Sequence, residues 1–137
     1  MYKQISLPIK STPNQRRVLK FRLASQRRTW GKDGLGLYCP ICGELITGAP
    51  DMHEVLITRG DFPKEKQYLI WDACNCTLVH QDCHRYAATK ENQQRLILSL
   101  VYHEGLDNIK LWLYMVEQYT KGNQVADAIR LLEECVK

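Results

Sequence analysis

Apolar positions in the last third of the chain repeat with the period of an α-helix. Three groups follow the i, i+3, i+4, i+7 spacing of a buried helix face. They are Leu96, Ile97, Leu100 and Val101; then Ile109, Trp112, Leu113 and Val116; then Val125, Ala128, Ile129 and Leu132. Gly105 and Gly122 follow the first two groups and are typical helix stops. The pattern predicts three packed helices over residues 93–137 that form a cap on a small core.

The middle of the chain has the pattern of strands instead. Residues 54–58 and 67–71 are rich in β-forming side chains, and residues 59–63 between them carry turn signals, so we expect a hairpin. Residues 31–36 are expected to form a loop. A helix should begin near Gln81 or Asp82, which places His84 in its first turn, whereas Asn75 lies back on the preceding strand.

Towards the N-terminus, apolar residues alternate with cations, which predicts a short basic amphipathic helix that ends before Gly31. Residues 1–38 carry nine Lys and Arg against a single acid, Asp33, a net charge of +8. The whole chain is only +4, so residues 39–137 carry −4. A polyanion is the natural partner of such an arm. The alternative is a solvated charged face that packs on the core through Val18, Phe21 and Trp30.

Two pairs of metal-type ligands have the short spacing of a structural zinc site. Zinc takes four Cys or His ligands in a tetrahedron, and loops of two residues present them in pairs. The predicted ligands are Cys39, Cys42, His80 and Cys83. Cys74 and Cys76 compete for membership, but strand alternation turns them away from the face of Asn75, so we expect buried thiols.

Six cysteines without an export signal favour metal binding over disulfides. No segment approaches the roughly 18 apolar residues of a membrane span, so we expect a cytoplasmic protein with no membrane partner. The expected organisation is α+β, as a single folded unit. It consists of a basic arm over 1–38, a metal-binding core over 39–92 and a helical extension over 93–137.

A second group of side chains has no place in a structural zinc site. Hydrolysis of a phosphodiester needs a nucleophilic water, a proton acceptor and a cation that offsets charge on the phosphate. His53, Glu54, Asn75 and His84 provide suitable groups. A zinc-protease helix is excluded because Ile57 stands where the H-E-x-x-H motif requires its second histidine.

The stretch from Cys39 to His84 resembles the HNH endonucleases, in particular the small zinc-stapled enzymes common in bacteriophages. Their Asn-Leu-x-x-Leu-Cys-x-x-Cys-His ending aligns with Asn75 to His84, with His80 where the family usually has Cys. The resemblance implies a ββα-metal core with one structural zinc and one catalytic divalent cation. Mg²⁺ or Mn²⁺ is the expected catalytic ion, and a transition metal is the alternative. The resemblance also implies cleavage of one or both DNA strands to leave 5′-phosphate and 3′-hydroxyl ends.

The resemblance also implies roles for the residues. His53 and His84 would bind the catalytic cation, Glu54 would be the general base, and Asn75 would orient this pair or bind the cation. If the register shifts by one, His53 becomes the base and Met52 takes the ligand position, where it cannot bind a hard cation. The expected DNA contacts are Arg16, Arg17, Lys20, Arg27, Arg28, Arg59 and Arg85.

Two alternatives remain open beside an active nuclease. One is a zinc-stabilised DNA-binding module with weak or no catalysis, which the departure at Glu54 from the commoner histidine could produce. The other is an accessory protein for DNA packaging that works beside a phage terminase or portal.

Overall fold

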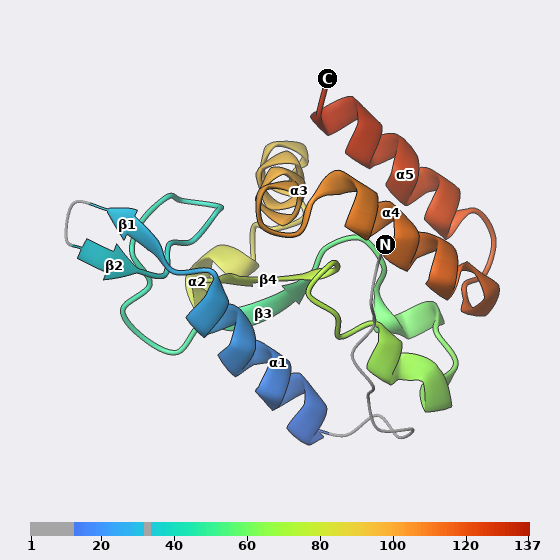
Figure 1. The fold of residues 1–137 in the computed structure, drawn as a ribbon, viewed down its shortest axis with the longest axis horizontal. Coiled ribbons are helices and arrows are strands. Elements are labelled where there is room, and N and C mark those ends of the chain that lie inside the picture. Colours follow the sequence, from blue (N-terminus) through green and yellow to red (C-terminus); the bar gives the residue numbers. More distant parts are fainter. Residues whose placement is uncertain (1–12, 32–33) are drawn as a thin grey trace.

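Helices and two short strand pairs make up the part of the chain that the computed structural model describes, residues 13–31 and 34–137 (Figure 1). The α-helices are α1 (Pro13–Gln26), α2 (Gln81–His84), α3 (Lys90–Glu104), α4 (Leu106–Val116) and α5 (Gln124–Cys135). The strands are β1 (Thr29–Gly31), β2 (Gly34–Gly36), β3 (Asp51–Glu54) and β4 (Cys76–Val79). Three 3₁₀ helices cover Arg59–Asp61, Lys64–Leu69 and Glu117–Tyr119. The α+β class is confirmed, whereas residues 1–12 of the expected arm, Lys32 and Asp33 lie outside the described residues.

The centre of the fold is the antiparallel pair of β3 and β4, which places His53 opposite Thr77. The predicted hairpin of residues 54–58 with 67–71 is wrong, because β3 pairs with β4 and two 3₁₀ helices occupy the connection. The β-forming residues of both segments are nevertheless buried, among them Val55, Ile57 and Ile70. Their apolar character therefore reflects burial in the core, which propensity alone does not distinguish from a strand.

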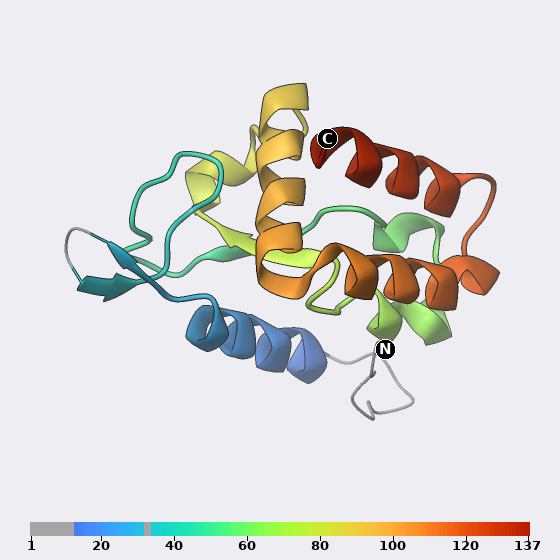
Figure 2. The same ribbon diagram turned by 45° about the horizontal axis from the view of Figure 1, so that its top comes forward.

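The three C-terminal helices are confirmed. The predicted stripes are buried except for Val101 and Ile129, which are partly buried, and α3, α4 and α5 pack on one another. In Figure 2, α4 and α5 run alongside each other and α3 lies across them. Gly105 and Gly122 end their segments with φ angles of 87° and 63°, a backbone conformation that favours glycine. Trp112, fully buried, donates from Nε1 to the Leu69 carbonyl at 3.2 Å and so fixes the cap to the core.

Helix α1 packs on β4 through Leu19 and Leu23, which are both buried (Figure 1). The predicted basic helix is thus present and ends before Gly31, at Gln26, whereas the expected loop at 31–36 contains β2. The alternative, in which Val18 and Phe21 pack on the core, is wrong because both side chains are exposed. The Trp30 side chain lies outside what the structure describes.

Arg27 is a buried structural residue, which corrects its expected role as a phosphate contact. Its guanidinium donates to the carbonyls of Cys76 and Ala73, at 2.7 Å each, and to the Glu104 carboxylate at 3.1 Å. Only 5% of the residue is exposed, so it joins α1 to β4 and α3 and cannot reach a partner.

Within the described residues, no helix combines the length and the apolar character needed to cross a membrane.

Candidate metal sites

The four predicted zinc ligands converge. The ligand atoms of Cys39, Cys42, His80 and Cys83 all lie within 4.8 Å of one another. A tight turn presents the first pair, because the Gly43 N–H donates to the Cys39 carbonyl at 2.7 Å and the Cys39 N–H donates to the Glu44 carbonyl at 2.9 Å. The second pair comes from the residue that precedes α2 and from α2 itself.

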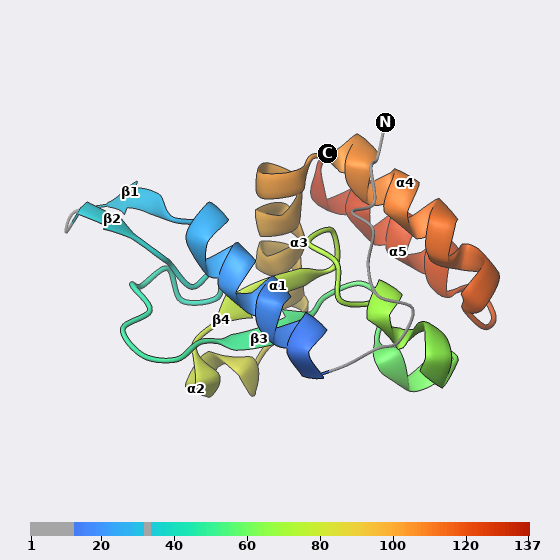
Figure 3. The same ribbon diagram turned by 60° about the horizontal axis from the view of Figure 1, so that its bottom comes forward.

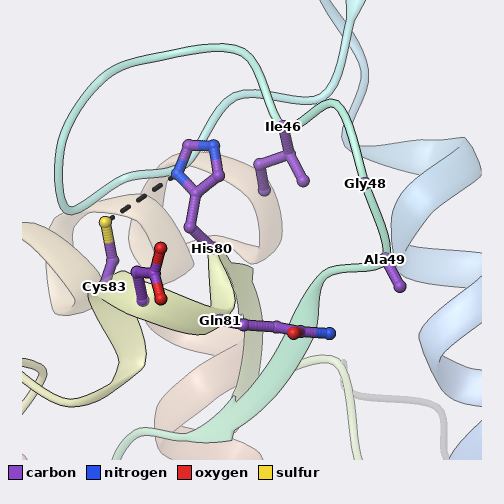
Figure 4. A pocket seen from close by; sticks show the side chains of 7 residues that line it. Ile46, Gly48, Ala49, His80, Gln81 and Cys83 are labelled. Carbon is purple, nitrogen blue, oxygen red and sulfur yellow. Dashed lines mark hydrogen bonds between the residues drawn. The ribbon is translucent and has the colours of Figure 1, made fainter.

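The distances in this cluster fit zinc. His80 Nδ1 lies 3.2 Å from Cys42 Sγ and 3.8 Å from Cys83 Sγ. Ligands of a tetrahedral zinc ion, at about 2.0 to 2.3 Å from it, are about 3.5 to 3.8 Å apart. His80 Nε2 lies 3.0 Å from the Leu45 carbonyl, an acceptor, so the ring proton belongs on Nε2 and the Nδ1 lone pair faces the sulfurs. A cavity of about 400 Å³ adjoins the His80 ring (Figure 4).

The pKa values of two thiols in this cluster shift in opposite directions. Burial raises the pKa of Cys39, but hydrogen bonds from the backbone of Cys42, His80 and Ile41 outweigh it and lower the pKa to about 7. Burial and the neighbouring sulfurs of Cys42 and Cys39 raise the pKa of Cys83 to about 12. The Cys39 sulfur thus ionises readily, and its negative charge opposes ionisation of Cys83. A bound cation would offset that charge.

Cys74 and Cys76 are buried thiols outside the cluster, as expected. Burial raises both pKa values, and the negative charge of Asp72 acts in the same direction on each. Both residues therefore stay protonated at neutral pH and are poor metal ligands.

The structure also brings the His53 and His84 side chains together. His53 lies on β3 and His84 is the last residue of α2, and their rings meet edge to face with centroids 5.0 Å apart. His53 Nδ1 is 3.1 Å from His84 Nε2. The other nitrogen of His84, Nδ1, is 3.0 Å from Asp51 Oδ2.

Asp51 is the residue that the sequence reasoning missed. Side chains alternate along a strand, so residues 51 and 53 share one face of β3, and this period-two spacing was the signal that could have found it. A carboxylate behind a metal-binding imidazole is a common arrangement, because it fixes the tautomer that presents the other nitrogen.

The two facing nitrogens are suitably spaced for one ion. Ligands at right angles and about 2.1 Å from a metal are about 3.0 Å apart, close to the 3.1 Å between His53 Nδ1 and His84 Nε2. Burial lowers the pKa of His53, and the nearby His84 lowers it further although Glu54 opposes the shift, which favours the neutral ring that a metal needs. Among the described residues, however, only the Cys39 cluster brings three or more such ligands to one point.

Glu54 belongs to a different contact network. Its carboxylate accepts from Trp71 Nε1 and from the Arg59 N–H, at 3.1 Å each, and lies 3.9 Å from Arg59 Nε. As the neighbour of His53 on β3, it projects from the opposite face of the strand. The structure therefore pairs it with Trp71 and Arg59 and does not pair it with His84. Met52, on that same opposite face, is buried in the core.

Asn75 is completely buried, and its amide is fully used by the backbone. Oδ1 accepts from the N–H groups of Leu56 and Ile57, at 2.9 and 3.0 Å. Nδ2 donates to the carbonyls of Ile57 and Ile70, at 2.8 and 3.1 Å. Two donors and two lone pairs are all that an amide offers, so Asn75 has no capacity left for a metal and holds the segment after β3 in place.

The other predicted DNA contacts lie at or near the surface. Arg17, Arg28, Arg59 and Arg85 are exposed, and Arg16 and Lys20 are partly exposed. Arg85 pairs with Asp82 at 3.4 Å, and Arg28 Nε donates to the Ala24 carbonyl at 3.1 Å.

No protein-family model, no curated protein and no solved structure matches this chain.

Proposed function

We propose that the protein is a metal-dependent DNA endonuclease of the HNH type, with a structural zinc ion in the Cys39 cluster. One observation carries the proposal: the imidazoles of His53 and His84 face each other at 3.1 Å, one on β3 and one on the helix that follows β4. Two of the four zinc-type ligands, His80 and Cys83, lie immediately before that same helix and within it. Both features agree with the ββα-metal arrangement that the sequence resembles.

In this proposal His53 Nδ1 and His84 Nε2 hold the catalytic cation. When bound, the cation would supply positive charge for the phosphate and the leaving oxygen. It would also lower the pKa of the attacking water, so that the proton of this water would pass to solvent without a carboxylate base. Asp51 accepts the Nδ1 proton of His84 and so keeps Nε2 free for the cation. Two imidazoles favour a transition metal such as Mn²⁺, Co²⁺ or Ni²⁺ over Mg²⁺.

The roles of Glu54 and Asn75 differ from those that the resemblance implied. Glu54 holds Trp71 and Arg59, so we assign it to positioning these side chains rather than to proton transfer. Asn75 positions the chain after β3 and thereby the strand that carries His53. The zinc ion would fix α2, and with it His84, relative to the turn at Cys39.

The test is incubation of the zinc-loaded protein with supercoiled plasmid and Mg²⁺, Mn²⁺, Co²⁺ or Ni²⁺. We expect nicked or linear DNA whose breaks DNA ligase seals, since ligase requires the 5′-phosphate and 3′-hydroxyl ends of this mechanism. His53→Ala and His84→Ala should abolish cleavage, and Asp51→Asn should weaken the apparent affinity for the cation by about 10- to 100-fold. His103→Ala, at the remaining histidine, is the matched control and should cleave normally.

The second candidate is a zinc-stabilised DNA-binding module without catalysis. The engagement of Glu54 by Trp71 and Arg59 favours it, because no other carboxylate was expected to act as the base. DNA that is retarded but remains uncut with all four cations would establish this candidate and reject the endonuclease.

A further inference from the structure

Helix α1 exposes two apolar side chains, Val18 and Phe21. We call the surface formed by these two residues and Arg17 the outer face of α1. Phe21 is 70% exposed and Val18 is 56% exposed. They are three residues apart and therefore neighbours on the helix surface. The opposite side of α1 is already used, because Leu19 and Leu23 are buried. Together the two side chains give the outer face of α1 a small exposed apolar patch.

The charge of α1 indicates the kind of partner that would bind to it. The helix contains four cations and no acidic residue: Arg16, Arg17, Lys20 and Arg22. None of the four forms an ion pair with another residue of the described ranges, 13–31 and 34–137. Such an uncompensated cationic helix attracts a polyanion.

The outer face is held in a fixed position relative to the candidate catalytic strands. Arg27, immediately after α1, bonds to the Cys76 carbonyl of β4, and Cys76 lies opposite Glu54, the neighbour of His53. In Figure 3, α1 passes in front of the β3–β4 pair, and it packs on β4. Phe21 is six residues from Arg27, which is about 9 Å along a helix.

We propose that the outer face of α1 docks on DNA, with the α1 cations on phosphates and the Phe21 ring stacked on a base or inserted at a base step. DNA with an unpaired or easily unstacked base is then the preferred substrate. The inference takes DNA as the partner from the proposed function. Apolar side chains of this kind insert between bases in proteins that bend DNA, and aromatic rings stack on unpaired bases.

Two other occupants fit the face less well. A membrane-surface helix needs a broad apolar face, whereas Leu19 and Leu23 of α1 are already buried in the core. A second copy of the chain, docked through the same face about a two-fold axis, would bring the four cations of each copy together.

The experiment compares the binding of two short labelled duplexes by fluorescence anisotropy. One duplex is fully paired, and the other is identical except for a single unpaired base. The zinc-loaded chain of 137 residues is used without a second cation, so that binding is measured apart from cleavage. We expect the wild type to prefer the duplex with the unpaired base by about tenfold. Phe21→Ala should remove that preference, and Phe21→Trp should retain it.

Tyr102→Ala is the matched control, since Tyr102 on α3 is 78% exposed and lies outside α1. It should bind both duplexes like the wild type. A 2-aminopurine beside the unpaired base should change in fluorescence when the wild type binds and should not respond to Phe21→Ala. Equal affinities of wild type and Phe21→Ala for both duplexes would overturn the inference.

Two further results would assign the outer face of α1 to a partner other than DNA. A dimer in sedimentation that Phe21→Ala dissociates would assign the face to a second copy. Phe21-dependent binding to phosphatidylserine vesicles, without Phe21-dependent binding to DNA, would assign it to lipid. Failure of the inference and failure of the proposed function are distinguishable: Phe21-dependent binding without plasmid cleavage rejects only the endonuclease, and cleavage with Phe21-independent binding rejects only the docking face.

Discussion

Asn75 and Arg27 are buried polar side chains that connect segments far apart in the sequence. The Asn75 amide joins residues 56–57 and Ile70, and the Arg27 guanidinium joins the end of α1 to β4 and Glu104. A buried polar group is stable only when its hydrogen bonds are made. Both residues therefore stabilise the fold. By residue type alone, Asn75 was also a suitable metal ligand and Arg27 a suitable phosphate contact.

The first prediction concerns Asn75→Ala. The substitution leaves the N–H groups of Leu56 and Ile57 and two carbonyls without their partner, and each unsatisfied buried group costs about 1 to 3 kcal/mol. We expect the free energy of unfolding to fall by roughly 3 kcal/mol or more in urea denaturation of the zinc-loaded protein. Asn108→Ala, an exposed amide with one bond to the Glu104 carbonyl, should change it by less than about 0.5 kcal/mol. Equal losses of stability for the two variants would contradict this account.

The second prediction compares two consecutive arginines. Arg27→Ala removes three hydrogen bonds and leaves the partly buried Glu104 carboxylate without its cation, which costs about 3 to 5 kcal/mol when a buried pair is broken. Arg28→Ala removes an exposed side chain and should cost less than about 0.5 kcal/mol. Thermal and urea unfolding of both variants measure the difference. Similar stability of the two variants would show that Arg27 is not a structural residue.

Among the elements, the Cys39 cluster connects the turn at residues 39–44 to α2, a helix of four residues. A helix this short has little stability of its own, so its position depends on what is attached to it. His84 ends this helix, and the approach of His84 to His53 therefore depends on the zinc ligands.

The third prediction follows from the thiol environments. In the zinc-loaded protein, a thiol reagent such as DTNB should not label Cys74 or Cys76, because burial raises their pKa values, nor the three metal-bound cysteines. After removal of zinc with a chelator at neutral pH, the exposed Cys42 should react before Cys39, because the Cys39 side chain is buried although its pKa is about 7. Peptide mapping of the labelled sites measures the order. Labelling that a chelator does not change would contradict a metal in this cluster.

The sequence predicted these elements unevenly, for a physical reason. The helices α3 to α5 each bury one face, so the period of their apolar residues is visible in the sequence. The strand β3 has four residues, and its partner β4 begins 22 residues after β3 ends, so no local pattern identifies the pair. The spacing of the Cys39 cluster was visible because a tetrahedral metal site would impose it, whereas Asp51 became recognisable only once the register of β3 was known.

At the scale of the whole molecule, positive charge is concentrated at the N-terminus. Residues 1–38 carry a net charge of +8, and the whole chain carries +4. A field arranged in this way orients an approaching polyanion before contact. Helix α1, which carries part of this charge, packs on β4. The field would therefore bring DNA to the side of the molecule where α1 lies.

The last prediction separates this arrangement from net charge alone. Neutralising Arg16, Arg17 and Lys20 to Gln should weaken DNA binding about equally across sequences, and should reduce the slope of log K against log salt by about 0.9 for each phosphate that the protein no longer neutralises. The matched control, Lys121, Arg130 and Lys137 changed to Gln, removes the same charge from the C-terminal region. Because phosphate binding is local whereas net charge is not, the control should keep its salt slope. Anisotropy titrations over a range of salt concentrations measure both slopes, and equal slopes for the two triple variants would leave α1 without a specific role in binding.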